Sequence, residues 1–171
     1  MEQSNRLHED YITDQIEKYL LSEKTLPWNR VVQRPALHAK GADLILEGGE
    51  QNEYRFIIEC KGCSEKGKRQ PSNVEGWLHA LGQLVTRMQD PCERNDDGTI
   101  EILRKYQYGL GLWWGGAQSA LRRIPEYAAV QLNLYVLSVY DDGTVKQWTP
   151  QDFGKQHEKC EFAGLGTANF R

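Results

Sequence analysis

Residues 41–62, GADLILEGGEQNEYRFIIECKG, contain two short apolar runs that carry ionisable residues where core side chains are expected. The first run includes Asp43 and the second includes Glu59. Fifteen residues separate these two acids. Side chains alternate between the two faces of a strand, so Glu59 and Lys61 share one face while Cys60 takes the other. An amine beside two acids suits a hard-cation site, the chemistry of metal-assisted phosphodiester cleavage.

The glycine-rich turn at 48–52 joins the two runs, which predicts an antiparallel hairpin with strands over 42–46 and 54–61. Upstream, apolar residues recur at helical spacing, which predicts a helix over 6–23. Val31-Val32 predicts a first short strand before the hairpin.

Helical and strand patterns alternate in the chain after the hairpin. The expected elements are a helix from Ser72 or Asn73 to about Met88, a loop over 93–98, a strand over 106–114, a helix over 117–129 interrupted at Pro125, and a strand hairpin over 132–148. This order predicts an α/β fold in which helices cover the faces of a sheet.

The composition is that of an ordinary globular chain. The 171 residues suffice for one domain with a core, and 39% of them are hydrophobic and 26% charged. The net charge of −3 argues against a strongly basic protein that coats nucleic acid, although it leaves room for a local basic patch. We find neither a membrane-spanning apolar run nor a secretory signal, and we therefore expect a cytoplasmic protein without a membrane partner.

Three segments together resemble a known family. Gly41-Ala42-Asp43, then Ile58-Glu59-Cys60-Lys61, behind a helix that carries Glu9, resembles the PD-(D/E)xK nuclease superfamily of restriction-endonuclease-like enzymes. The resemblance implies an αβββαβ core with a mixed central sheet flanked by helices and an added C-terminal β-hairpin. The boundaries that it implies are a single domain over 1–171, a core over about 6–114, a peripheral helix and hairpin over 115–149, and a tail over 150–171.

The resemblance also assigns roles to individual residues. Asp43 and Glu59 correspond to the metal-binding acids, and Lys61 corresponds to the catalytic lysine, although Ala42 replaces an often-seen proline. Glu9 corresponds to a helix acid that some branches add to the site, and the main-chain carbonyl of Cys60 would give a further ligand. The implied cofactor is Mg²⁺, for which Mn²⁺ substitutes.

A second helix contributes one more candidate. Gln83 resembles the glutamine of the QxxxY helix in RecB-type nucleases, and Arg87 stands at the tyrosine position of that motif. Gln83 would hold a phosphate or a water by hydrogen bonding. The loop that follows Lys61 carries Lys66, Lys68 and Arg69, which we expect to contact the DNA backbone.

The expected function is that of a Mg²⁺-dependent DNA endonuclease in restriction, repair or mobile-element defence. We favour charge stabilisation by Lys61 over a free-amine base, because neighbouring carboxylates favour an ammonium group. The chain is too short for a separate target-recognition domain, so a homodimer or a partner chain that supplies specificity stays open.

Three other interpretations compete with an active nuclease. The same fold could serve as a catalytically inactive module that binds nucleic acid or protein. Asp43, Glu59 and Lys61 could form a plain cross-strand ion pair, although their apolar neighbours favour a buried sheet in which an unpaired acid is costly. Cys60 and Cys63 could form a redox pair or half a zinc site, although a buried Cys60 is the simpler interpretation.

Overall fold

The computed structural model describes residues 9–22, 27–34, 41–62, 71–88, 92–94, 100–102 and 105–155. The helices in these ranges are α1 (Glu9–Ser22), α2 (Pro71–Val85), α3 (Trp114–Arg123) and α4 (Glu126–Gln131), followed by a 3₁₀ turn, η2 (Pro150–Asp152). The strands are β1 (Trp28–Gln33), β2 (Leu44–Gly48), β3 (Tyr54–Lys61), β4 (Cys92–Arg94), β5 (Ile100–Ile102), β6 (Lys105–Trp113), β7 (Leu134–Val139) and β8 (Val145–Trp148). The predicted order of a helix, three strands, a helix and a strand is present.

Six of the strands form one mixed sheet in the order β1-β2-β3-β6-β7-β8. The central strands β3, β6 and β7 are parallel, and the outer pairs β1–β2, β2–β3 and β7–β8 are antiparallel. A parallel pair needs a crossover, which α2 supplies between β3 and β6. The predicted α/β fold with a mixed sheet is therefore confirmed.

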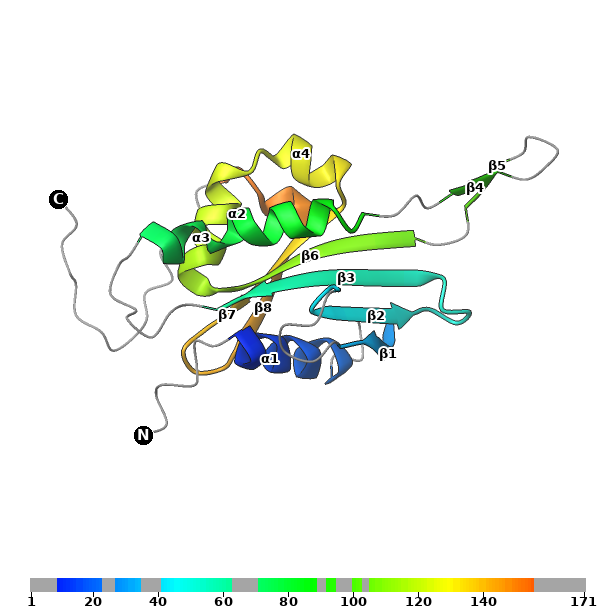
Figure 1. The fold of residues 1–171 in the computed structure, drawn as a ribbon, viewed down its shortest axis with the longest axis horizontal. Helices are drawn as coiled ribbons and strands as arrows, with labels where there is room; N and C mark the ends of the chain where they lie inside the picture. The colour runs from blue at the N-terminus through cyan, green and yellow to red at the C-terminus, as the bar shows by residue number, and fades with distance from the viewer. Residues whose placement is uncertain are drawn as a thin grey trace.

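Helices cover both faces of the sheet. In Figure 1, α1 lies against one face and α2, α3 and α4 lie against the other. Phe56, Ile58 and Cys60 of β3 pack in the core with α1, whereas Ile57 packs in the core with α2 and α3. The alternation along β3 thus places Glu59 on the α2 side of the sheet.

The structure differs from the sequence prediction in three places. Of the loop expected over 93–98, residues 93 and 94 instead belong to β4, and 95–98 lie outside the described residues. β4 pairs antiparallel with β5, and the pair lies away from the main sheet (Figure 1). Three-residue strands are too short to give a detectable period. The helix expected over 117–129 begins earlier, at Trp114 directly after β6. The interruption expected at Pro125 is present and separates α3 from α4, because proline lacks the N–H that a continuous helix needs.

The third difference concerns the C-terminal hairpin. β7 and β8 pair antiparallel as predicted, but β7 also pairs in parallel with β6, so the hairpin extends the central sheet. In the described ranges, no helix combines the length and the hydropathy that a transmembrane span needs.

The small residues of β6 allow α1 to pack closely on the sheet. A Cβ atom on Gly111 would lie 2.6 Å from both Cys60 Sγ and Ile16 Cδ1.

We expect Gly111→Ala to lower the free energy of unfolding by about 1–3 kcal/mol through overpacking, measured by urea denaturation. As a control, Gly82→Ala on the exposed side of α2 has no atom within 4 Å of its new methyl group. It should stabilise the protein by about 0.5–1 kcal/mol. Equal stability of the two variants would contradict the packing that we describe.

Candidate functional site

Three chain segments bring ionisable side chains to the carboxyl end of β3. Asp43 directly precedes β2, and because β2 is antiparallel to β3, its beginning lies beside the end of β3. The Asp43 carboxylate accepts a hydrogen bond from the main-chain N–H of Cys60 at 2.7 Å. Lys61 donates from Nζ to Oε2 of Glu9, in the first turn of α1, at 3.1 Å. Of the residues predicted to share one site, Asp43 thus contacts the main chain at Cys60, and the next residue, Lys61, contacts Glu9.

The thiol of Cys60, which lies in the middle of this segment, has a raised pKa. Burial raises its pKa from the ordinary value of 9.0 to about 12; a hydrogen bond with Thr13 acts in the opposite direction. Among the weaker electrostatic influences, the carboxylates of Asp43 and Glu9 raise this pKa and the ammonium of Lys61 lowers it.

Cys60 is fully buried in the core formed with α1, the environment of an unreactive structural cysteine. Its predicted partner Cys63 lies outside the described residues. Burial of one thiol disfavours the redox or zinc interpretation.

The raised pKa of Cys60 makes stability depend on pH. Above pH 9 the thiol ionises in the unfolded chain but stays protonated in the folded protein until about pH 12. Rising pH therefore favours unfolding in this window. We expect the stability difference between wild type and Cys60→Ala to shrink by up to about 1.4 kcal/mol per pH unit above pH 9. Urea denaturation between pH 7.5 and 10.5 measures this difference. A difference that stays constant with pH would contradict the burial of the thiol.

The Glu59 carboxylate is neutralised by a partner other than Lys61. The side chain is 1% exposed and forms an ion pair with Arg87, which lies in the turn after α2, two residues beyond Val85. Neither Glu59 oxygen makes a hydrogen bond with a described residue, and both are buried. The ion pairs are thus Glu59–Arg87 and Lys61–Glu9, which differ from the cross-strand pairing of Asp43, Glu59 and Lys61 considered from the sequence.

Arg87 is the site residue whose role the sequence did not reveal. It follows Gln83 by one helical turn, at the position where the QxxxY motif has tyrosine, and this substitution was the available signal. Gln83 itself is exposed on α2. The predicted DNA-contacting residues Lys66, Lys68 and Arg69 lie outside the described residues.

The donor atoms match a hard cation in their chemistry. Asp43 and Glu9 offer carboxylate oxygens, and buried Glu59 offers an Oε2 atom without a hydrogen-bond partner among described residues. Mg²⁺ prefers such oxygens and keeps several waters. Within the described ranges, however, no three His, Cys, Asp or Glu side chains are grouped closely enough to hold a metal. The charge that faces the buried Glu59 carboxylate in this structure is the guanidinium of Arg87.

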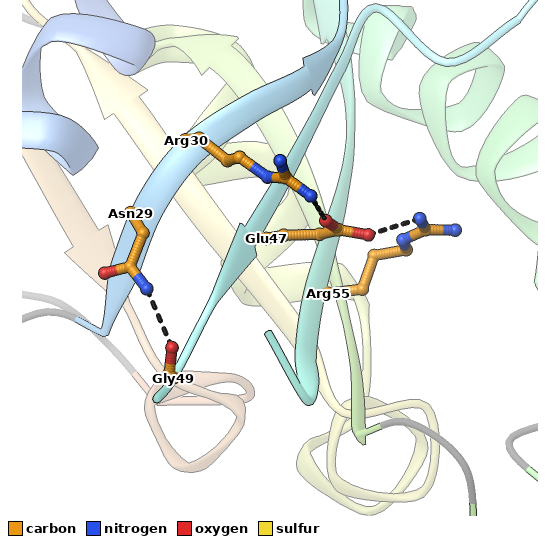
Figure 2. A network of polar contacts seen from close by, with 5 residues as sticks. All are labelled: Asn29, Arg30, Glu47, Gly49 and Arg55. Atoms are coloured by element: carbon orange, nitrogen blue, oxygen red, sulfur yellow. Dashed lines mark hydrogen bonds and ion pairs between the residues drawn. The ribbon is translucent and has the colours of Figure 1, made fainter. Parts of the chain in front are cut away.

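A second buried acid on the same face of the sheet shows how this fold neutralises a carboxylate. Figure 2 shows Glu47 of β2 between Arg30 of β1 and Arg55 of β3, with ion-pair distances of 2.8 and 2.5 Å. The three residues are direct cross-strand neighbours. Beside them, Asn29 donates a hydrogen bond to the carbonyl of Gly49 at 2.7 Å, which ties β1 to the turn after β2. Two arginines from the neighbouring strands β1 and β3 thus neutralise Glu47.

A small cavity adjoins the end of β3 on the α2 side. It is lined by Lys61, Gly62, Gly76, Trp77, Leu112, Trp113 and Gly116. Gly76 belongs to α2 and Gly116 to the first turn of α3, so both helices approach β3 with glycine.

Comparisons with protein-family models, curated proteins and solved structures give no match for this chain.

The Glu59–Arg87 pair has a measurable structural role. Arg87→Met leaves a buried carboxylate without its cation, so we expect the free energy of unfolding to fall by about 3–5 kcal/mol. Arg30→Met is the matched control, because the Arg30 side chain is 63% exposed and Glu47 keeps Arg55. Its cost should stay within about 1 kcal/mol. Chemical denaturation of both variants measures the difference, and similar costs would contradict the pairing of Arg87 with a buried acid.

Proposed function

We propose that this chain is a metal-dependent phosphodiester hydrolase, most specifically a Mg²⁺-dependent DNA endonuclease of the PD-(D/E)xK type. The observation that carries the proposal is the meeting of Asp43, Lys61 and Glu9, from three separate segments, at the carboxyl end of β3. The order α1, β1, β2, β3, α2, β6 supports a restriction-endonuclease-like core. Carboxylates that can hold a divalent cation and a lysine that can stabilise negative charge are groups that support phosphodiester hydrolysis.

Each residue has a distinct task in this proposal. Asp43 and Glu9 would hold Mg²⁺ together with the main-chain carbonyl of Cys60 and the carboxylate of Glu59. When bound, Mg²⁺ offsets the charge of the phosphate and lowers the pKa of a bound water. Lys61 is held by Glu9 at the edge of the site, from where its ammonium stabilises negative charge that develops on phosphorus.

The cavity beside Lys61 supports a phosphate as the group that is recognised. Its glycines leave space for close approach to the backbone, because they carry no side chain. Gly116 lies in the first turn of α3, where main-chain N–H groups favour an anion. A DNA phosphate placed there would lie beside Lys61.

An inactive binding module of the same fold is the second candidate. It is favoured by the ion pair of Glu59 with Arg87, which occupies one of the carboxylates that a cation needs. This candidate predicts binding of nucleic acid or protein without turnover. Cleavage assays separate the two.

The test is Mg²⁺-dependent cleavage of duplex, branched and single-stranded DNA by purified protein. We expect Asp43→Asn and Lys61→Met each to lower the cleavage rate by about 10²–10³-fold, as expected for loss of a group that stabilises the transition state. Asparagine still accepts the hydrogen bond from Cys60 N–H, so the first variant should fold.

Lys105→Met is the matched control for Lys61→Met, because Lys105 begins the neighbouring strand β6 at its opposite end. It should keep the wild-type rate. Failure of the wild type to cut any of these DNA substrates with Mg²⁺ or Mn²⁺ would overturn the proposal. Cleavage that is unchanged in both site variants would also overturn it.

A further inference from the structure

The two buried acids on the α2 side of the sheet face different numbers of cations. Glu59 faces one guanidinium, that of Arg87. Glu47 faces two, because Arg30 donates to its Oε2 atom at 2.8 Å and Arg55 donates to its Oε1 atom at 2.5 Å (Figure 2). One guanidinium offsets one carboxylate, so the Arg30–Glu47–Arg55 cluster carries one positive charge beyond the number that neutralises its acid.

This surplus charge reaches the surface at Arg30. The side chain of Arg30 is 63% exposed, whereas that of Arg55 is 20% exposed and that of Glu47 is 4% exposed. Arg30 contacts Glu47 through Nη2, and its Nε and Nη1 atoms make no hydrogen bond with a described residue. Glu47 thus fixes one side of the guanidinium, and the remaining N–H groups are free to donate to a ligand.

A second arginine at the same edge of the sheet shows the opposite balance. Arg34 directly follows β1 and pairs with two acids of α1, Asp14 and Glu17. The charge of Arg34 is therefore more than offset by its partners. Arg30 and Arg34 have the same side chain and lie one strand length apart, but only Arg30 has charge to spare for a partner outside the chain.

The acids of the nearby turn do not take up this charge. Glu50 and Glu53 lie between β2 and β3, and the Glu53 carboxylate accepts a hydrogen bond from the main-chain N–H of Gln51 at 3.0 Å. Neither acid forms an ion pair with Arg30, whose acidic partner among the described residues is Glu47. The exposed guanidinium therefore keeps its attraction for an anion from solution.

We propose that Arg30 is a docking residue for a phosphate of the DNA backbone, apart from the phosphate that reacts. This inference rests on the proposed function in its choice of DNA as the partner, but the contact itself needs no divalent cation. A guanidinium presents a planar fork of N–H donors that matches phosphate oxygens, and Glu47 orients that fork. Such contacts position a duplex without reading its sequence.

The place of the cluster in the sheet separates the two phosphates. Arg55 and Lys61 lie on the same face of β3, six residues apart, which corresponds to about 20 Å along the strand. Phosphates of one DNA strand advance by about 3.4 Å per base pair, so a duplex that reaches both places extends over at least about six base pairs. Loss of Arg30 should therefore weaken binding and leave the chemical step unchanged.

The direct test is binding of a fluorescein-labelled DNA duplex to the full chain in EDTA, measured by fluorescence anisotropy between about 50 and 200 mM salt. Because EDTA removes divalent cations, binding is measured without cleavage. We expect Arg30→Gln to weaken binding about three- to fivefold. It should also lower the slope of log K against log salt by about 0.9, the value for one phosphate contact. Arg30→Lys should keep the slope, because it keeps the charge.

Arg34→Gln is the matched control. It removes the same charge from the same edge of the sheet, but from an arginine that two acids already offset. It should leave the salt slope at the wild-type value, and thermal unfolding followed by circular dichroism should show that each variant is folded. Equal changes of slope in Arg30→Gln and Arg34→Gln would overturn the inference, and so would a wild-type slope in Arg30→Gln.

An NMR measurement distinguishes backbone phosphate from free phosphate without relying on the affinity of a variant. The Nε–H signal of Arg30, assigned by its absence in Arg30→Lys, should shift when the DNA duplex is added, and that of Arg34 should stay in place. A shift with inorganic phosphate but none with DNA would assign Arg30 to a small oxyanion and overturn the DNA contact.

Cleavage assays separate this inference from the proposed function. With Mg²⁺, Arg30→Gln should raise KM and keep kcat. DNA binding that depends on Arg30, without cleavage by the wild type, would support the docking contact and overturn the hydrolase. Cleavage by the wild type, with the same KM and salt slope in Arg30→Gln, would support the hydrolase and overturn the docking contact. Absence of DNA binding at low salt would overturn both.

Discussion

The parallel pairing of β3 with β6 is the constraint on which the rest of the structure depends. It extends over the whole of β3, from Tyr54 opposite Lys105 to Lys61 opposite Leu112. Parallel neighbours cannot be joined by a tight turn, so α2 must cross one face of the sheet between them. The same pairing buries β3 between two cores, with α1 on one side and α2 and α3 on the other. Any charged residue in β3 therefore needs a partner from a neighbouring element.

The partners of these charges explain how the site is organised. Glu59 points to the α2 side and pairs with Arg87, which the crossover brings to the same face. Lys61, at the end of the strand, reaches Glu9 of α1 on the other side. Asp43 accepts a hydrogen bond from the main-chain N–H of Cys60, the residue between Glu59 and Lys61 in β3. The end of β3 thus gathers acidic and basic side chains from both layers.

Much of the fold could be predicted because the patterns are local. The β3 boundaries, the turn before it and the three-strand start follow from apolar alternation and glycine. The β4–β5 hairpin could not be predicted because its strands have three residues each, too few to show a period. The resemblance predicted one site for Asp43, Glu59, Lys61 and Glu9; in the structure Asp43 contacts Cys60 and Lys61 contacts Glu9, whereas Glu59 pairs with Arg87. The role of Arg87 was missed because only its departure from a motif was visible.

The sequence by itself determined which elements form, in which order, and which of their residues are ionisable. Alternation on a strand and periodicity on a helix depend on neighbours within a few residues, so one chain segment suffices to specify them. Only the tertiary structure decided which charge neutralises which. The Glu59 carboxylate pairs with a guanidinium that lies 28 positions further along the chain. That choice depends on where the crossover helix ends relative to β3, and burial makes the choice of partner energetically decisive.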